Sequence, residues 1–312
     1  MADIICGVDV SSEWLDACVR GSGEVARFAN TVAGIEALAI LCREHEVSLV
    51  AMEATGGYER FAFTLLWTAG IPCAVVNPRS VRCFAEAMGL LEKTDRIDAG
   101  AIAWYAEAKK IAARPPASEV QQRLRALVTR LRQLTDLRTM QSNQRRLVDN
   151  AEARTSIDDL LALIGKQIRT FEAQIATTLE LDPLWAELDA AFRSIKGVAD
   201  RTVARLLAQM PEIGTVSNKG AAKLIGLAPI ANESGKRHGR RPVRGGRSDV
   251  RALLFVVAEV VRRHEPDFIE FHKKLTAAGK PKKLIRVALA RKLLVRLNAK
   301  ARDVRQKQTV IA

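Results

Sequence analysis

The stretch "IICGVDVSSEWLDACVR", residues 4–20, decides how the first part of the chain folds. Residues 4–10 and 15–20 are two short runs dominated by apolar residues, which is typical of strands. The Ser-Ser-Glu sequence between them is long enough only for a tight connection. A third strand is expected in "VARFANT", residues 25–31. The chain therefore begins with three consecutive strands.

Helices and strands alternate after this opening. One helix is expected at 34–45, and a second in "ERFAFTLLWTAG" (59–70), ending at Gly70. Between and after them, "VSLVAMEAT" (47–55) and "IPCAVVNP" (71–78) predict buried strands. Three strands followed by alternating helix and strand is the order of an RNase H-like (RuvC-like) α/β domain. In that fold the first and fourth strands lie side by side.

Acids lie at the ends of those two strands and at the start of a later helix. Asp9 ends the first strand and Glu53 the fourth, in apolar surroundings where a carboxylate needs a cation or partner. Asp95 and Asp98 open the helix expected in "KTDRIDAGAIAWYAEA" (93–108) and can converge on one point. Taken alone, such a pair more commonly caps a helix N-terminus. Together the four carboxylates suit a two-metal site for Mg²⁺ or Mn²⁺ acting on a phosphodiester.

The charge of the chain is unevenly distributed. The 312 residues carry a net charge of +14, but residues 1–192 hold 21 Lys and Arg against 26 Asp and Glu. Residues 193–312 hold 28 against 9, so the last part carries +19. Such a concentration of positive charge favours binding to double-stranded DNA or to RNA over binding to an anionic membrane.

The sequence also indicates the cellular compartment. No stretch approaches the roughly 18 uninterrupted apolar residues of a membrane span, and "MADIICGVDV" lacks the features of a signal peptide. A cytoplasmic protein, bound to the nucleoid, is therefore expected. The five cysteines form no CxxC pair and are predicted to be reduced core residues, without a disulfide or a zinc site.

Long helices are expected in the middle of the chain. From Val120 to Leu134, apolar residues recur at alternating spacings of four and three, and the pattern resumes between Ile157 and Ile175. This spacing predicts a coiled-coil seam, for which pairing between subunits of a dimer or tetramer is the simplest explanation. The segment after it is expected to be mainly helical. A Gly-containing turn at 196–199 fits a helix-hairpin-helix that binds phosphate, although an ordinary helical turn looks the same.

A resemblance to a known family rests on four segments: "GVDVSSEWLDACV", "MEATGGYE", "KTDRIDAGAIA" and "LIGLAPIANESGKRHGR". They resemble the insertion-sequence transposases with a DEDD RuvC-like domain, a group that includes pilin-gene invertases and bridge-RNA-guided recombinases. The resemblance implies a RuvC-like catalytic domain at 1–115, dimerisation helices at 116–185 and a basic transposase domain at 186–312. It also implies a guide RNA, together with donor and target DNA. The catalytic residues that it implies are Asp9, Glu53, Asp95, Asp98 and Ser234.

The implied nucleophile, Ser234, lies in "ANESGKRHGRRPVRGGRS" (231–248), which is expected to be an irregular loop because it has no apolar period. From the residues alone, a loop in which Ser234 only donates a hydrogen bond to a phosphate is the simpler reading. A serine nucleophile would preserve the phosphodiester bond as a phosphoserine, so rejoining would need no ATP. The residues expected to contact nucleic acid are Lys196, Lys236, Arg237, Arg240, Arg241, Arg244 and Arg247.

Three functions remain in competition on the sequence. The leading hypothesis is a site-specific recombinase that joins DNA strands by transesterification. The second is a structure-selective nuclease in which the same acids activate water. The third is a non-catalytic protein that bridges nucleic acids and whose acids only cap helices. Metal dependence of strand cleavage would separate the third, and trapping a covalent adduct would separate the first two.

Overall fold

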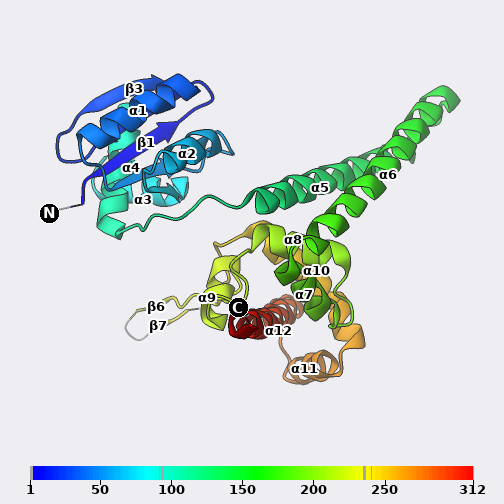
Figure 1. The fold of residues 1–312 in the computed structure, drawn as a ribbon. Helices are drawn as coiled ribbons and strands as arrows, with labels where there is room; N and C mark the ends of the chain where they lie inside the picture. The colour runs from blue at the N-terminus through cyan, green and yellow to red at the C-terminus, as the bar shows by residue number, and fades with distance from the viewer. Residues whose placement is uncertain (1–2, 91, 93–94, 235–236, 240, 312) are drawn as a thin grey trace. The chain divides into compact units, whose positions relative to one another are not determined.

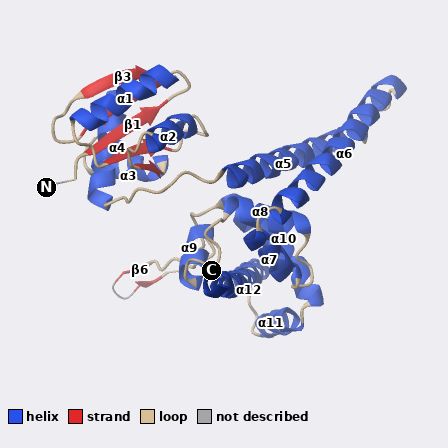
Figure 2. Cartoon of the chain, in the orientation of Figure 1, coloured by secondary structure: helices blue, strands red, loops and turns tan. Residues whose placement is uncertain are grey.

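The computed structural model describes residues 3–90, 92, 95–234, 237–239 and 241–311. It divides into two compact units, Met1–Ala117 and Ser118–Ala312. The first unit contains a five-stranded sheet, whereas the described part of the second is helical except for a two-stranded hairpin (Figure 2). A functional boundary at residue 185, inside the second unit, stays a prediction.

The first unit is a mixed sheet with helices on both faces (Figure 1). The strand order is β3-β2-β1-β4-β5; β1 pairs antiparallel with β2 and parallel with β4. The predicted mixed α/β domain is confirmed, and its first and fourth strands are neighbours. Its elements are β1 (Ile5–Val10), β2 (Trp14–Val19), β3 (Val25–Ala29), α1 (Val32–Glu44), β4 (Leu49–Glu53), α2 (Glu59–Thr68), β5 (Cys73–Val76), α3 (Pro78–Ala87) and α4 (Asp95–Lys109).

Alternation along β1 assigns its side chains to two cores. Cys6 and Val8 pack with α1 and α2 on one face, whereas Ile5 packs with α3 and α4 on the other. Gly7 faces α4 so closely that a Cβ there would lie 2.1 Å from the carbonyl oxygen of Ala99. Glycine at this position therefore lets the backbone of α4 lie directly against the central strand.

The second unit has one extended hydrophobic core, to which α5, α6, α7, α8, α9, α10, α11 and α12 all contribute. Phe192, Leu254 and Leu293 are among its fully buried side chains. Its elements are α5 (Glu119–Arg145), α6 (Ala151–Glu180), α7 (Pro183–Arg193), α8 (Asp200–Gln209), α9 (Asn218–Ile225), β6 (Glu233–Ser234), β7 (Arg237–His238), α10 (Ser248–His264), α11 (Pro266–Ala277) and α12 (Lys282–Ile311).

The predicted seam packs within one chain. Helices α5 and α6 form an antiparallel hairpin (Figure 1), closed at its free end by an ion pair between Arg145 and Asp158. Leu124, Leu131 and Ile168 are buried in the core of the same unit. These seam residues already have partners inside one subunit, so the prediction that the seam joins subunits has no support from the fold.

Replacing Leu131 with Asp should therefore lower the free energy of unfolding of the single chain. Leu131 is 7% exposed, and losing its buried apolar side chain from the core should cost at least about 2 kcal/mol. Urea unfolding followed by circular dichroism measures this change. Leu163→Asp is the matched control, because Leu163 lies on the same hairpin but is 53% exposed. A Leu131→Asp chain of unchanged stability but smaller oligomeric state would instead place the seam between subunits.

The cysteines agree in part with the prediction that they are core residues. Cys6, Cys42 and Cys73 are buried, and Cys18 is half-buried. Burial raises the pKa of the Cys73 thiol to about 12, so this thiol stays protonated and unreactive. Cys83 differs, because it is exposed on α3. None of the helices within the described residues has the length and apolar character needed to cross a membrane.

Candidate functional site

Strand pairing brings Asp9 and Glu53 to the same edge of the sheet. Val8 of β1 pairs with Met52 of β4 in a parallel register, so the next residue on each strand is Asp9 and Glu53. Because side chains alternate along a strand, both acids lie on the face that α4 covers. The carboxyl ends of two adjacent parallel strands therefore carry one acid each.

Helix α4 places its own acids toward that edge. Ala99 and Ala103 lie against Gly7, while Glu107, near the other end of α4, pairs with Arg20 at 2.6 Å. Arg20 donates its backbone N–H to the carbonyl of Ile5, at the start of β1. Helix α4 thus runs antiparallel to β1, and its N-terminal turn reaches the end of β1 that carries the acid.

The two acids of α4 both lie in its first turn. Asp98 directly precedes Ala99, the residue that touches Gly7. Asp95 is the first residue of the helix, but its side chain lies outside the described residues. The backbone places both positions in the turn of α4 nearest the strand ends, where the positive end of the helix dipole favours carboxylates. Their convergence on one metal ion stays a prediction.

The acids share an edge without forming a ready cluster. Among the side chains that the structure describes, no three His, Cys, Asp or Glu residues are grouped as a metal ion would require. Asp9, Glu53 and Asp98 each have an interaction within the protein. The donor chemistry nevertheless fits Mg²⁺ or Mn²⁺, since every candidate ligand is a carboxylate, two at neighbouring strand ends and two in the first turn of α4.

A fifth acid, Asp16, lies beside this edge and is not among the site residues predicted from the sequence. It is the cross-strand partner of Asp9 in the β1–β2 pair. Like charges in such a pair are destabilising, and Arg27 offsets the charge of Asp16 through two hydrogen bonds of 2.7 and 3.0 Å. The alternation of Asp16 with the buried Leu15 and Ala17 was the available signal, but only the register revealed its neighbour.

The segment around Ser234 is more ordered than predicted. Instead of an irregular loop it contains a short hairpin, in which Ser234 pairs with Arg237 across β6 and β7. An isolated bridge between Pro229 and Val243 closes the base of the segment. Two-residue strands of polar residues have no apolar period, so the sequence could not indicate them. The Ser234 residue is exposed, and the turn residues 235 and 236 lie outside the described part.

Several of the predicted nucleic-acid contacts have partners inside the protein. Arg241 binds the carboxylate of Glu233 at 2.5 Å, and Arg247 binds Glu212 at 2.5 Å. Arg244 is exposed and forms no ion pair with any described residue. Surface pairs of this kind contribute little to stability, so a phosphate can compete for these arginines. Lys236, Arg240 and the side chain of Arg237 lie outside the described residues.

The turn at 196–199 links α7 to α8, but part of its backbone faces inward. The N–H of Lys196 donates to a carboxylate oxygen of Glu265 at 2.9 Å. Gly197 has a φ of 99°, and a Cβ there would lie 3.1 Å from the backbone nitrogen of Val261. The Lys196 N–H is therefore not available to a phosphate. Lys196 is an exposed residue, and contact between its side chain and nucleic acid stays a prediction.

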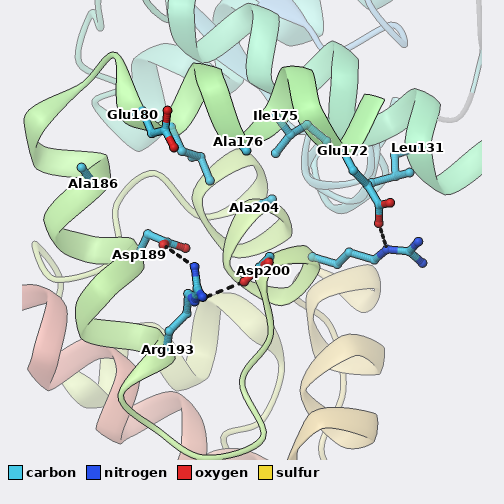
Figure 3. A pocket seen from close by; sticks show the side chains of 12 residues that line it. Leu131, Glu172, Ile175, Ala176, Glu180, Ala186, Asp189, Arg193, Asp200 and Ala204 are labelled. Atoms are coloured by element: carbon cyan, nitrogen blue, oxygen red, sulfur yellow. Dashed lines mark hydrogen bonds and ion pairs between the residues drawn. The ribbon is translucent and has the colours of Figure 1, made fainter. Parts of the chain in front are cut away.

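A pocket of about 400 Å³ lies beside this turn, between α6, α7 and α8 (Figure 3). Its arginines point toward neighbouring acids: Arg193 lies 3.4 Å from Asp189, and Arg201 lies 2.5 Å from Glu172. Arg193 also pairs with Asp200 at 3.2 Å. The four acids that line the pocket outnumber its two arginines, which makes it a weaker anion site than the serine segment.

Two family models match most of the chain. The IS110-type DEDD transposase model matches residues 6–148, which contain all four acids. The model of the IS116/IS110/IS902 transposase family matches residues 189–273, which contain Ser234. The first match therefore covers the strand ends and the helix turn that carry the acids, and the second covers the hairpin that carries Ser234.

Full-length relatives and one solved structure are also similar to this chain. The pilin gene-inverting proteins of Moraxella bovis and Moraxella lacunata are each 27% identical over 309 residues, covering 94% of both chains. The RuvC structure of Thermus thermophilus is 17% identical, with a TM-score of 0.26, and covers 36% of this chain and 99% of its own.

The two family models and the two relatives indicate the same class of protein. The chain is a DNA transposase or recombinase. It belongs to the IS110 family of DEDD transposases.

Proposed function

We propose that the chain recombines DNA at specific sites by transesterification, with acids of the first unit and a serine of the second as its catalytic groups. The observation that carries this proposal is the pairing of β1 with β4, which sets Asp9 and Glu53 side by side beneath the first turn of α4. A purely structural role explains two acids at adjacent strand ends poorly, because each raises the cost of burying the other.

Asp9, Glu53, Asp95 and Asp98 would hold Mg²⁺ or Mn²⁺ through their carboxylate oxygens. When bound, the metal supplies positive charge that stabilises the attacking and leaving oxygens of a phosphodiester. The protein contributes the geometry. Strand pairing fixes the backbone at Asp9 and Glu53, and the close contact of α4 with Gly7 fixes the height of Asp98 above the sheet.

Ser234 would act as the nucleophile. Its Oγ forms a bond to phosphorus while the bond from phosphorus to one deoxyribose oxygen breaks, and that oxygen takes up the proton released by the serine. A hydroxyl of a second strand then attacks the phosphoserine, and the proton returns to Ser234. One phosphodiester bond is replaced by another, so the exchange needs no ATP. The exposure of Ser234 in a short hairpin supports this role, because a DNA backbone can reach it.

The basic last part of the chain would bind the nucleic acids. Residues 193–312 hold 28 Lys and Arg against 9 Asp and Glu, which suits donor DNA, target DNA and a guide RNA. We assign the contacts around the serine to the exposed arginines of its segment, above all Arg244. In this proposal residues 1–115 are the catalytic domain and 186–312 the DNA-binding domain of a dimer or tetramer. The helices of 116–185 link the two, because their buried seam packs within one chain.

The test of the proposal is strand exchange by the purified full-length chain. We expect exchange between donor and target duplexes with Mg²⁺, none with EDTA, and a discrete RNA extractable from the active protein. Digesting that RNA should abolish exchange while leaving the protein folded. Exchange that continues at an unchanged rate in EDTA would contradict the metal site. Exchange unaffected by complete RNA digestion would contradict guidance by RNA.

A further inference from the structure

The loop after β4, residues 54–58, is held by a single carboxylate. One oxygen of Glu59 accepts hydrogen bonds from the N–H of Gly57 at 2.8 Å, the N–H of Thr55 at 3.1 Å and the hydroxyl of Thr55 at 3.2 Å. Glu59 is only 9% exposed, although it opens a surface helix. Three donors on one oxygen fix the loop directly after Glu53, at the edge where the acids lie.

The tip of this loop is open to a ligand. Gly56 and Gly57 have φ angles of 76° and 126°, which only glycine adopts easily. A Cβ on Gly56 would meet no atom within 4 Å, so the backbone there is bare toward solvent. A chain such as a nucleic-acid backbone can therefore approach this turn closely.

Two side chains at the end of the loop suit a nucleotide. Tyr58 is 57% exposed, and no aromatic ring or cation of the described residues stacks on it. The guanidinium of Arg60 lies beside the loop, because a Cβ on Gly57 would be 3.7 Å from its Nε. Arg60 forms no ion pair within the described part of the chain, which distinguishes it from Arg20 and Arg27 of the same unit.

An exposed aromatic residue alone is common on protein surfaces. Here the exposed ring belongs to a loop that is fixed by a buried carboxylate. Arg60, which has no ion pair among the described residues, lies next to it, and the acid edge lies at its base. Because the backbone on either side of the ring is held by Glu59, less entropy is lost when a base stacks on it, and base stacking does not depend on sequence.

We propose that this loop binds one unstacked nucleotide of the DNA strand. The ring of Tyr58 stacks on the base, Arg60 neutralises an adjacent phosphate, and Glu59 is a positioning residue that holds the ring in place. This rests on the proposed function, because it assumes a DNA strand at the acid edge. Its consequence is that the first unit, and not only the basic last part, holds the strand that is cut.

The probe is a gapped DNA duplex with 2-aminopurine in the unpaired gap, whose fluorescence falls when the base stacks. It is mixed with the full-length chain in Ca²⁺ buffer, which permits binding without cleavage. Wild type and Tyr58→Phe should quench the probe, whereas Tyr58→Ala should not, and its affinity should fall about tenfold. Ile40→Ala is the matched control: it removes an exposed apolar side chain from α1, which covers the face of the sheet opposite α4 and the acids.

A double-variant cycle tests whether Glu59 acts through Tyr58. Glu59→Ala should lose quenching like Tyr58→Ala, while Glu59→Gln should retain it because an amide oxygen still accepts the three hydrogen bonds. The double variant Tyr58→Ala/Glu59→Ala should bind no more weakly than either single variant. Additive losses would show that Glu59 does not act through Tyr58. Normal quenching by Tyr58→Ala would overturn the nucleotide site, whereas a wild-type chain that binds no DNA would overturn the proposed function itself.

Discussion

Asp9→Asn is expected to slow DNA strand cleavage by at least about a thousandfold, and Glu53→Gln by a similar factor. Each substitution removes one negative charge from the metal site and keeps the shape of the side chain, so the stabilisation of charge by the metal is lost. Folding should survive. Because Asp9 faces Asp16 across the β1–β2 pair, the neutral asparagine removes a repulsion and should leave the melting temperature equal or higher.

The rate of cleavage of a labelled duplex in Mg²⁺ and the melting temperature measure these two effects. Asp16→Asn is the matched control, since it also removes one charge from the same face but from a residue that Arg27 already neutralises. We expect its rate to stay within about tenfold of wild type. Mn²⁺ binding measured by calorimetry should weaken for Asp9→Asn and not for Asp16→Asn. Wild-type rates for both Asp9→Asn and Glu53→Gln at low Mg²⁺ would refute the metal site.

Ser234→Ala is expected to abolish the covalent protein–DNA adduct. A nicked suicide substrate lets the free strand escape before rejoining, so wild-type protein should accumulate a denaturant-resistant adduct with the phosphate on Ser234. The variant lacks the only atom that can form this bond. Its affinity for DNA should change by no more than one hydrogen bond, about 1 kcal/mol, because Ser234 is exposed and the hairpin is held by backbone pairing.

Ser248→Ala is the control for this experiment, because it changes another exposed serine of the same segment, at the first position of α10. That variant should form the adduct normally. A nuclease that uses activated water makes the opposite prediction: no adduct from wild type, and cleavage by Ser234→Ala within a few-fold of normal. This second pattern would end the serine mechanism and leave the acid site intact.

Much of the first unit could be predicted from local patterns. The strands expected at 4–10 and 15–20 are β1 and β2, and the helix ending near Gly70 is α2. Each was predictable because short apolar runs, glycine stops and alternation are local properties. The order of strands and helices along the chain also predicted that the first and fourth strands are neighbours, because few topologies fit three strands followed by alternating helices and strands.

Other features depended on contacts between distant residues. The periodicity of α5 indicated its buried face, which includes Leu124, Leu131 and Leu134 but not the exposed Val120. It could not show whether the partner of that face is another subunit or α6 of the same chain. The cross-strand position of Asp16 depends on register, and a shift of one residue would have placed it on the other face. The hydrogen bonds from Thr55 and Gly57 to Glu59 depend on the backbone angles of the loop, which no pattern in the sequence indicates.

By itself, the sequence determined the strands and most helices of the first unit, though not α3, together with the positions of the four candidate acids, the basic last part and the resemblance to a transposase family. These are properties of composition, spacing and order, which are present before the chain folds. Only the tertiary structure decided which acids are neighbours across the sheet, that α4 lies against Gly7, and that Glu59 holds the loop at the acid edge. Those facts arise from strand register and close backbone packing, which bring together residues far apart in the chain.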